Sequence, residues 1–322
     1  MKRAFSFLAV VCAFGLVAEQ ASAQTVIRAA FGTVPGHPSF IGLERFKEIV
    51  EEKTDGSIVV ELFPDRQLGE ERETVEGLQL GTVDMTVVST GPLGAFVPEV
   101  NVLDLPFLFK DSDHVYRVLD GEVGQELLRK FDAVGIVGLA WWENGWRHLT
   151  AKKPIDEPED LSGVKLRTMQ NPVHIAAFQT LGAAPIPMVW GEVFTSLGQG
   201  VIDAQENPIT VIYTNSLWEV QSNVMLTGHV YGPHAVLFSK ATWGRLSEDE
   251  QQAIREAARE ATDFQRETSA RLEAEGIEKL RERGMAVQDV DIGPFQSATA
   301  ELANTAPNVD PGLLARIRAL AD

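Results

Sequence analysis

Two segments of the sequence repeat the same junction between a helix and a strand, and this repeat limits what the chain can fold into. Residues 78–84 (LQLGTVD) and 197–203 (LGQGVID) each place a glycine between a helical stretch and a β-rich run, and polar residues follow each run. A glycine just after a helix commonly ends it, so each segment predicts a helix, a turn and a strand. The repeat therefore predicts two similar α/β lobes facing a cleft, a place that favours small ligands.

Strand-like and helix-like patterns alternate along the first two thirds of the chain. β-rich runs predict strands at residues 26–31, 58–63, 83–88, 136–142, 164–168 and 201–204. Apolar residues at helical spacing predict helices at residues 39–50, 70–80, 112–131 and 172–181. Ser39 is the predicted cap of the first helix, and the third has an expected interruption at Gly121 or Gly124. This alternation indicates βαβ units, and thus an α/β fold with a mostly parallel sheet.

The longest predicted helix lies near the C-terminus. Ser247 and Glu250 form a capping box at its start, and the helical pattern continues to about Glu282. About 35 residues of helix extend about 50 Å, more than one small lobe, so we expect the helix to bridge both lobes. A coiled-coil segment is the alternative, but the apolar stripe lacks sustained leucines. The stripe consists of Ile254, Ala258, Ala261, Phe264, Thr268 and Leu272.

The N-terminus has the pattern of an export signal. Two basic residues precede an uncharged, mostly apolar run, and Ala21-Ser22-Ala23 follows as an A-x-A cleavage site. We predict a signal peptide over residues 1–23 and a periplasmic or secreted location; a membrane anchor is the alternative, although the run is short for a bilayer span. The one cysteine, Cys12, would leave with the signal, so we expect neither a disulfide framework nor a multi-cysteine metal site.

The chain is strongly acidic, with a formal net charge of −18. This charge argues against nucleic acid or an anionic membrane as a main partner, because phosphates are neutralised by clustered lysine and arginine. The six histidines are scattered, and the motifs typical of nucleophilic hydrolases, zinc peptidases and nucleotide-binding loops do not occur. We therefore expect no catalysis, no cofactor and no metal; a catalytic pair that only the fold brings together is the alternative.

Five ordered segments carry a resemblance to a known family. They are ENGWR at 143–147, LSGVKLRT at 161–168, LGAAPIPM at 181–188, GEVF at 191–194 and GVIDAQENP at 200–208. In this order and with an export signal, the chain resembles the solute-binding proteins of tripartite ATP-independent periplasmic (TRAP) transporters, and is similar to the members that bind sialic acid, sugar acids or dicarboxylates. The resemblance covers essentially the whole chain after residue 23.

The resemblance implies a two-lobed periplasmic binding protein, an α/β fold with hinge strands and a long helix spanning both lobes. Lobe I would comprise residues 24–144 plus 233–272, and lobe II residues 145–232 plus 273–322. The resemblance also implies that the protein captures an organic acid, closes over it as a monomer and delivers it to membrane permease subunits, without catalysis.

Arg167 is the strongest candidate for a ligand contact. Side-chain alternation in the strand at 164–168 places it on the face opposite Leu166, near the carboxyl end of the strand. A guanidinium can hold a carboxylate with two parallel hydrogen bonds, which lysine cannot do. The alternative is a solvated strand arginine. The resemblance implies the ligand-binding role, because Arg167 matches the arginine with which the family binds the ligand carboxylate.

The resemblance implies further contacts, each with a structural alternative. Arg147, at a predicted strand-to-loop joint, matches a second arginine on the ligand, and the alternative is an ion pair on the lobe surface. Asn207 matches an amide contact, and the alternative is a turn residue before Pro208. Trp190 matches an aromatic that packs on the ligand, and the alternative is a place in the lobe core.

The remaining candidates come from the same resemblance. They are His229, Asn171, Ser89, Glu71 and Asn144. Ser89 stands where the sialic-acid-binding members carry an acidic residue, so a shorter sugar acid, such as a uronate or an aldonate, or a related hydroxy acid is expected in place of sialic acid. A C4-dicarboxylate, an aromatic acid or ectoine is the alternative ligand. A periplasmic enzyme and a sensor partner that presents ligand to a receptor are the alternative functions.

Overall fold

The computed structural model describes residues 24–321. The predicted signal peptide, residues 1–23 with Cys12, lies outside these residues. The described chain contains nine strands, which form one mixed sheet in the order β2-β1-β3-β8-β4-β7-β5-β6, with β9 paired to β8. The strands are β1 (Thr25–Phe31), β2 (Ile58–Phe63), β3 (Met85–Ser89), β4 (Ile136–Ala151), β5 (Lys165–Thr168), β6 (Ala184–Pro187), β7 (Ala204–Pro208), β8 (Asn223–Ser239) and β9 (Ala286–Gln288).

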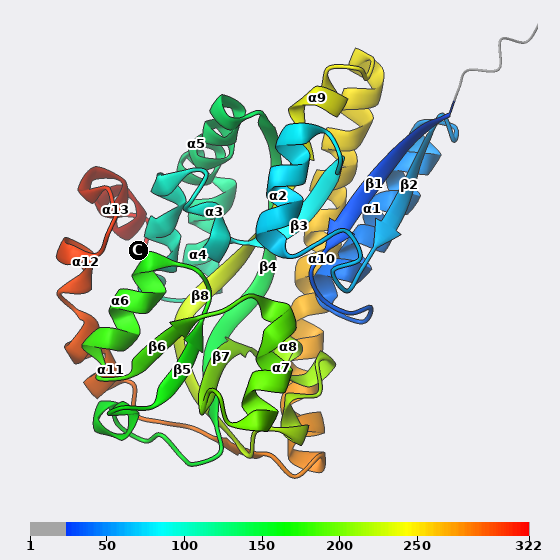
Figure 1. The fold of residues 1–322 in the computed structure, drawn as a ribbon. Helices are drawn as coiled ribbons and strands as arrows, with labels where there is room; N and C mark the ends of the chain where they lie inside the picture. The colour runs from blue at the N-terminus through cyan, green and yellow to red at the C-terminus, as the bar shows by residue number, and fades with distance from the viewer. Residues whose placement is uncertain (1–23, 322) are drawn as a thin grey trace, which may run out of the picture.

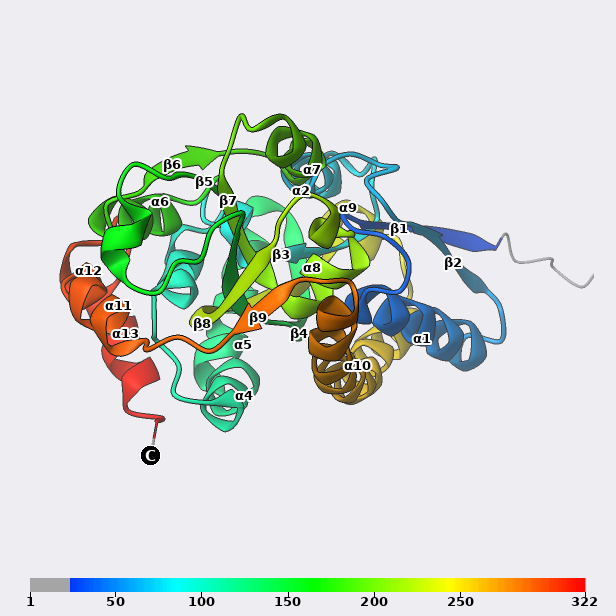
Figure 2. The ribbon, with the colours of Figure 1, turned by 90° about the horizontal axis from the view of Figure 1, so that it is seen from below.

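Helices cover both faces of this sheet (Figures 1 and 2). The α-helices are α1 (Pro38–Lys53), α2 (Glu71–Leu80), α3 (Thr90–Leu93), α4 (Ser112–Asp120), α5 (Glu122–Lys130), α6 (Pro172–Thr180), α7 (Trp190–Gln199), α8 (Ile209–Thr214), α9 (Lys240–Trp243), α10 (Glu248–Glu282), α11 (Gly293–Thr299), α12 (Leu302–Thr305) and α13 (Pro311–Arg318). The 3-10 helices are η1 (Pro98–Asp104), η2 (Phe131–Val134), η3 (Pro158–Leu161) and η4 (Leu217–Glu219).

Two long antiparallel strands, β4 and β8, run through the middle of the molecule and join its two lobes (Figure 1). In the first lobe, residues 136–143 of β4 pair with residues 233–239 of β8, which also pair with β3. In the second lobe, residues 147–151 of β4 pair with both β7 and the start of β8.

The register between β4 and β8 shifts where they pass from one lobe to the other. Gly145 faces Gly232 at this point, and the φ angle of Gly145 is +116°, a conformation that favours glycine. The bend that the two strands make between the lobes therefore coincides with a pair of residues that carry no side chain.

Apolar clusters fill both faces of the sheet. Trp141 and Trp142, neighbours in β4, belong to different clusters because successive side chains of a strand point to opposite faces. Trp141 packs with α4, α5 and the C-terminal helices, whereas Trp142 packs with α1 and α10. Smaller clusters around Phe178 and Val193 form the core of the second lobe.

The prediction of a long bridging helix is confirmed by α10. Ser247 caps it and forms the capping box with Glu250, and α10 lies beside α1 in both views (Figures 1 and 2). Phe264 was predicted to belong to the apolar stripe, but it is exposed, while Gln265 is buried and bonded to the backbone of Glu143 in β4. Gln265 therefore joins α10 to β4 through hydrogen bonds.

Several predicted boundaries are wrong because long-range pairing sets them. The strand at 136–142 continues to Ala151, since β8 pairs along its whole length, and Arg147 therefore lies inside a strand and not at a strand-to-loop joint. The strand predicted at 201–204 is β7, which begins at Ala204 where pairing with Ala151 of β4 begins. The sequence patterns predict no strand at β8.

Two helix ends were predicted from the sequence, the cap of α1 and the break between α4 and α5. The cap of α1 is His37, whose Nδ1 accepts the Ser39 N–H at 3.1 Å, and not Ser39 itself. The predicted interruption at Gly121 is confirmed, because this residue separates α4 from α5.

The last helix packs against an element far away in the sequence. Residues 273–322 were predicted to belong to lobe II; among them, α13 contacts α5, and Arg316 bonds Glu126 there at 2.7 Å. Its apolar residues Leu313, Leu314 and Ile317 join the cluster of Trp141, which explains the return of the chain.

Candidate functional site

A cavity lies between the lobes, beside the point where β4 and β8 cross. It holds about 430 Å³ of unfilled space, including its opening to solvent. Residues of both lobes and of the crossing strands line it: Phe31, Gly32, Thr33, Glu71, Ser89, Asn144, Arg147, Arg167, Met169, Trp190, Asn207, Val211 and His234.

Most of the residues predicted from the sequence meet at this cavity. Those that line it are Glu71, Ser89, Asn144, Arg147, Arg167, Trp190 and Asn207. Two predicted residues, Asn171 and His229, are buried behind the wall and support other side chains. Residues scattered over more than a hundred positions of the chain are thus brought to one place by the crossing of β4 and β8.

Arg167 is a buried cation without a protein anion. Its side chain leaves β5, is 4% exposed, and donates from Nε and Nη2 to the carbonyl oxygen of Met188 at 3.0 and 2.8 Å. Its Cζ lies 5.6 Å from the centre of the Trp190 ring. Within residues 24–321, no carboxylate lies within 4.0 Å of this guanidinium. Burial lowers the pKa of Arg167 to about 10, so the group remains positive at neutral pH and offers an anion site.

Arg147 differs, because Glu206 of β7 neutralises it. Both Nε and Nη2 of Arg147 donate to the Glu206 carboxylate, and Nη2 also donates to the Glu206 carbonyl at 2.7 Å. The alternative considered for Arg147 was an ion pair on the lobe surface. The ion pair exists, but it is buried. Glu206 was not among the predicted site residues, and only its place between Gln205 and Asn207 at the end of a strand could have suggested it.

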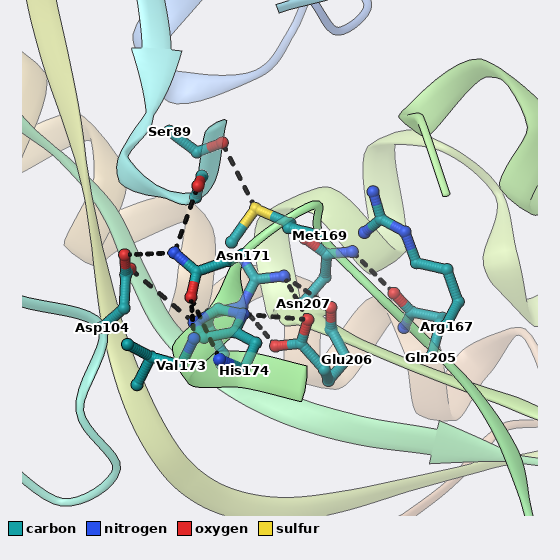
Figure 3. Close-up of polar contacts among 12 residues, drawn as sticks. Ser89, Asp104, Arg167, Met169, Asn171, Val173, His174, Gln205, Glu206 and Asn207 are labelled. Carbon is teal, nitrogen blue, oxygen red and sulfur yellow. Dashed lines mark hydrogen bonds and ion pairs between the residues drawn. The ribbon is translucent and has the colours of Figure 1, made fainter. Parts of the chain in front are cut away.

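Further titratable groups surround Glu206. The Nε2 atom of His229 lies 3.4 Å from Glu206 Oε2. The Nδ1 atom of His174 lies 4.0 Å from Glu206 Oε1 (Figure 3). On its other side, His174 Nε2 lies 3.7 Å from Asp104 Oδ1. These side chains form a buried polar layer that links η1 of the first lobe to α6 and β7 of the second.

The pKa values of this layer follow from burial and charge. Although burial alone would raise it, the charge of Arg147, its hydrogen bonds to Glu206 and the nearby His229 hold the pKa of Glu206 well below its usual range. Burial lowers the pKa of His174 to about 3 and raises the pKa of Asp104 to about 7. At neutral pH His174 is therefore neutral, and Glu206 is ionised.

Asn171 holds this layer together. It caps α6, because its Oδ1 accepts the backbone N–H groups of Val173 and His174 at 2.8 and 3.0 Å. Its Nδ2 donates to Asp104 Oδ2 at 2.8 Å and to the carbonyl of Gly91 at 3.1 Å, both in the first lobe. Asn171 therefore joins the lobes from behind the cavity instead of lining it.

The first lobe contributes a carboxylate to the cavity. Glu71, in the first turn of α2, accepts hydrogen bonds from the Ser89 backbone N–H at 2.8 Å and from the Ser89 hydroxyl at 2.7 Å. Ser89, which stands where an acidic residue is expected in the sialic-acid-binding members, thus orients an acidic side chain from elsewhere in the chain.

Amide and imidazole groups complete the polar wall. Asn144 Oδ1 is buried and has no hydrogen-bond partner within the described residues. Asn207 uses one N–H of Nδ2 to bond Gln205 Oε1 at 2.6 Å. His234, which was missed because nothing in the local pattern of β8 marks it, bonds the Ser39 hydroxyl through Nδ1 at 2.8 Å. The wall can therefore both accept from and donate to hydroxyl groups.

Trp190 lies between the lobe core and the cavity. It begins α7, packs beside the cluster of Val193 and lines the cavity next to Arg167. An aromatic face beside a guanidinium gives this side of the cavity an apolar surface for the carbon skeleton of a ligand.

Two searches bear on other functions. Among residues 24–321, no three His, Cys, Asp or Glu side chains are placed to hold a metal ion together. In the same part of the chain, no helix combines the length and the apolar character needed to cross a membrane.

Comparison with known proteins identifies the family. Residues 31–307 match the family described as bacterial extracellular solute-binding protein, family 7. The chain belongs to this family. It is 45% identical over 282 residues to a solute-binding protein of Verminephrobacter eiseniae, which covers 87% of this chain and 84% of that protein. The family-7 proteins bind solutes outside the cytoplasm, and those of TRAP transporters are periplasmic.

Two crystal structures of family-7 proteins share the fold closely. A TRAP solute-binding protein from a Polaromonas species, bound to D-erythronate, has a TM-score of 0.89 and 41% identity, covering 92% of this chain and 99% of that one. The sugar acid binding protein DctPAm of Advenella mimigardefordensis, in complex with galactonate, has a TM-score of 0.90 and 34% identity, covering 92% and 98%. The predicted two-lobed α/β fold and the TRAP resemblance are confirmed.

Proposed function

We propose that this chain is the periplasmic receptor of a TRAP transporter for a hydroxylated monocarboxylic acid, a sugar acid such as an aldonate or a uronate or a related hydroxy acid. The ligand carboxylate binds Arg167, and its hydroxyl groups bind Glu71, Asn144 and Asn207. The closed receptor then delivers the acid to the membrane permease subunits.

The observation that supports this proposal most strongly is that the protein neutralises one of the two cavity arginines and not the other. Arg147 is neutralised by Glu206, so it adds little net charge to the cavity, whereas Arg167 has no anion of its own. The ligand carboxylate is therefore expected at Arg167, the arginine that the protein has not already paired with an anion. A charged arginine that is buried beside an aromatic ring is a favourable partner for a carboxylate and offers it a planar set of donors.

The carboxylate of Glu71 supports one class among the alternative ligands. Glu71 lines the cavity from the first lobe, whereas Arg167 lines it from the second. The carboxylate oxygens of Glu71 accept hydrogen bonds. A second carboxylate on the ligand would be repelled there, while a hydroxyl would donate to it. This arrangement favours a polyhydroxy acid over a C4-dicarboxylate or an aromatic acid. The family-7 relatives with bound D-erythronate and galactonate support the same class.

The lobe boundaries and the location are part of this proposal. We place the hinge at Gly145 and Gly232, at the boundaries 144/145 and 232/233, with α13 added to the first lobe. The chain is exported by residues 1–23 and acts as a monomer without catalysing a reaction. An adjacent permease gene favours transport over a sensor role, and recovery of the bound acid unchanged argues against an enzyme.

A thermal-shift experiment tests the proposal. The exported chain is heated with D-erythronate, D-galactonate, D-glucuronate or succinate, next to Arg167→Ala and to Lys165→Ala, an exposed control on the same strand. A ligand at about a thousand times its Kd adds about 4 kcal/mol, which raises Tm by several degrees at roughly 2–4 °C per kcal/mol. We expect shifts with the hydroxy acids that Arg167→Ala loses. A shift with succinate alone, or one that survives in Arg167→Ala, contradicts the proposal.

A further inference from the structure

A hydrogen bond connects the two lobes at the edge of the cleft. Glu70, which directly precedes α2, accepts the backbone N–H of Gly191, in the first turn of α7, at 3.1 Å. The helix α2 is fixed in the first lobe through Leu78, and α7 is fixed in the second lobe through Val193. Because the two partners belong to different lobes, the bond exists only while the lobes are close together.

Residue 191 has no side chain, which leaves room for this contact. A Cβ atom on Gly191 would lie 2.4 Å from Glu70 Oε1, closer than such atoms approach, and 3.3 Å from Arg66 Nε, a tight contact. The backbone of Gly191 is not in the left-handed region, so glycine is not needed there for conformation. Glycine is also an unfavourable helix residue. With a larger residue here, the carboxylate of Glu70 would have to move away from the Gly191 N–H.

Electrostatics favour the carboxylate in this position. The first turn of α7 has unpaired N–H groups and the positive end of the helix dipole, which attract an anion. Arg66 adds a positive charge, with its Nε 3.7 Å from Glu70 Oε1 and its Nη1 bonded to the carbonyl of Gly32 at 3.1 Å. Glu70 is thus held between a cation of its own lobe and a helix end of the other.

The contact also stands at a passage to the ligand cavity. A second cavity, with about 310 Å³ of unfilled space, is lined by Glu70 and shares Glu71, Arg167 and Trp190 with the ligand cavity. On each side, the residue in the contact is the chain neighbour of a residue in the ligand cavity: Glu70 of Glu71, and Gly191 of Trp190. Formation of the contact therefore positions both walls of the site.

We propose that Glu70 and Gly191 form a latch, a contact that keeps the lobes closed over the bound solute and slows its release. The latch touches no ligand atom; it positions α2 and α7. The solute leaves only when the latch opens, so the latch slows dissociation, and its effect is measured on the dissociation rate.

The test is a double-mutant cycle on ligand release, which rests on the proposed function for its ligand. D-erythronate and D-galactonate are the probes, and dissociation is followed by stopped flow. We expect Glu70→Ala and Gly191→Ala each to speed release about three- to tenfold, the range for a typical intramolecular hydrogen bond. The double variant is expected to release no faster than either single variant, since both remove the same contact.

Matched controls separate the latch from helix effects. Gly198→Ala makes the same change later in α7, where the new methyl group meets only Val220 at ordinary distance, and Glu192→Ala removes an exposed charge from the same turn. Both are expected to leave release unchanged. Unchanged release in the latch variants, additive effects in the double variant, or equal effects in the controls would overturn the latch.

A second measurement needs no ligand. The exported chain is predicted to lack cysteine, so Leu80→Cys on α2 and Gln199→Cys on α7, both exposed, can carry spin labels that report the distance between the lobes. We expect a short-distance population that Gly191→Ala reduces and Gly198→Ala does not. If the acids do not bind but this population responds, the ligand assignment is wrong and the latch stands. Identical distributions in all variants overturn the latch.

Discussion

The two arginines of the cavity are the same residue in nearly the same degree of burial, yet their surroundings differ. Arg147, in the central strand β4, has its anion supplied by the protein, in Glu206, and a layer of buried polar side chains lies behind it. Arg167, in β5, has only the carbonyl oxygen of Met188 and the ring of Trp190. The protein itself supplies the counter-charge of Arg147, whereas Arg167 gains a counter-charge only when an anionic solute binds.

This difference separates the free energy of folding from the free energy of binding. Removing one partner of a buried ion pair leaves the other charge uncompensated, which is strongly destabilising. A buried cation that has no partner already lowers stability in the ligand-free protein, and an anion that arrives recovers this loss as affinity. We therefore expect substitutions around Arg147 to act on unfolding and substitutions of Arg167 to act on affinity.

The largest expected effect is on the side of Arg147. Glu206→Gln removes the anion and leaves Arg147 buried with an amide, so the free energy of unfolding should fall by about 3–5 kcal/mol. Urea unfolding of the ligand-free chain measures it. Glu71→Gln, which changes a less buried carboxylate of the same cavity, should have a much smaller effect; equal losses in the two variants would show that the buried pair is not special.

The next effect separates stability from affinity at Arg167. Arg167→Met should weaken binding of the acid by about 2–5 kcal/mol, roughly thirtyfold to several thousandfold. The ligand-free protein should be no less stable, because a buried charge without an anion has been removed. Calorimetric titration and urea unfolding check both parts. Loss of stability comparable to that of Glu206→Gln would contradict the contrast between the two arginines.

The free energy of unfolding should also depend on pH through the buried polar layer behind Arg147. His174 has a pKa of about 3 in the folded protein, below the ~6.5 of an unfolded chain. Its contribution is present above pH 6.5 and is lost as the pH falls, by up to about 2 kcal/mol at pH 5. Urea unfolding at pH 8 and pH 5 should show this slope, and His174→Gln should reduce it by the share of this one histidine, since burial also lowers the pKa of His37 and His148 to about 3. An unchanged slope would mean that His174 is protonated in the folded state.

The contribution of Asp104, next to His174, to the pH dependence of stability has the opposite sign. Its folded pKa of about 7 lies above that of an unfolded aspartate, so the folded state binds the extra proton between about pH 4 and pH 7. Stability from this group is present at the acid end and is lost as the pH rises through 7. Asp104→Asn should therefore make the protein relatively more stable at pH 8 than at pH 5, when each is compared with the unsubstituted chain.

The smallest expected effect concerns the carboxylate of the first lobe. Ser89→Ala removes the hydroxyl that orients Glu71, and the affinity for a hydroxy acid should fall by about 1 kcal/mol, roughly fivefold. Affinity for a plain monocarboxylate such as propionate should not change, because it makes no hydroxyl contact. A loss of equal size for both acids would show that Ser89 acts through the cavity shape instead.

Local patterns were sufficient where local interactions decide the structure. The capping box at Ser247 and the apolar spacing behind it predict α10 to within a residue, and Gly121 predicts the break between α4 and α5. Arg167 was predicted as the strongest candidate from its strand position together with the family resemblance, and it lies in the cavity.

Features that depend on distant partners could not be predicted in this way. Glu206 is important because it meets Arg147, 59 residues away, and His234 because it meets Ser39, 195 residues away. The strand β8 has no distinctive pattern, since both faces of it are buried by separate clusters and no alternation of polar and apolar residues results. Asn171 and His229 were predicted to contact the ligand, but they lie behind the cavity, where Asn171 bonds Asp104 and His229 lies beside Glu206.

The crossing of β4 and β8 has a consequence for how the chain is made. The sheet of the first lobe needs the end of β8 between β3 and β4, so more than two thirds of the chain must be synthesised before that lobe can close. Contacts between residues so far apart in sequence form slowly. A chain that cannot finish its first lobe early stays extended for longer, which is the state in which a protein can be threaded through a membrane before it folds on the other side.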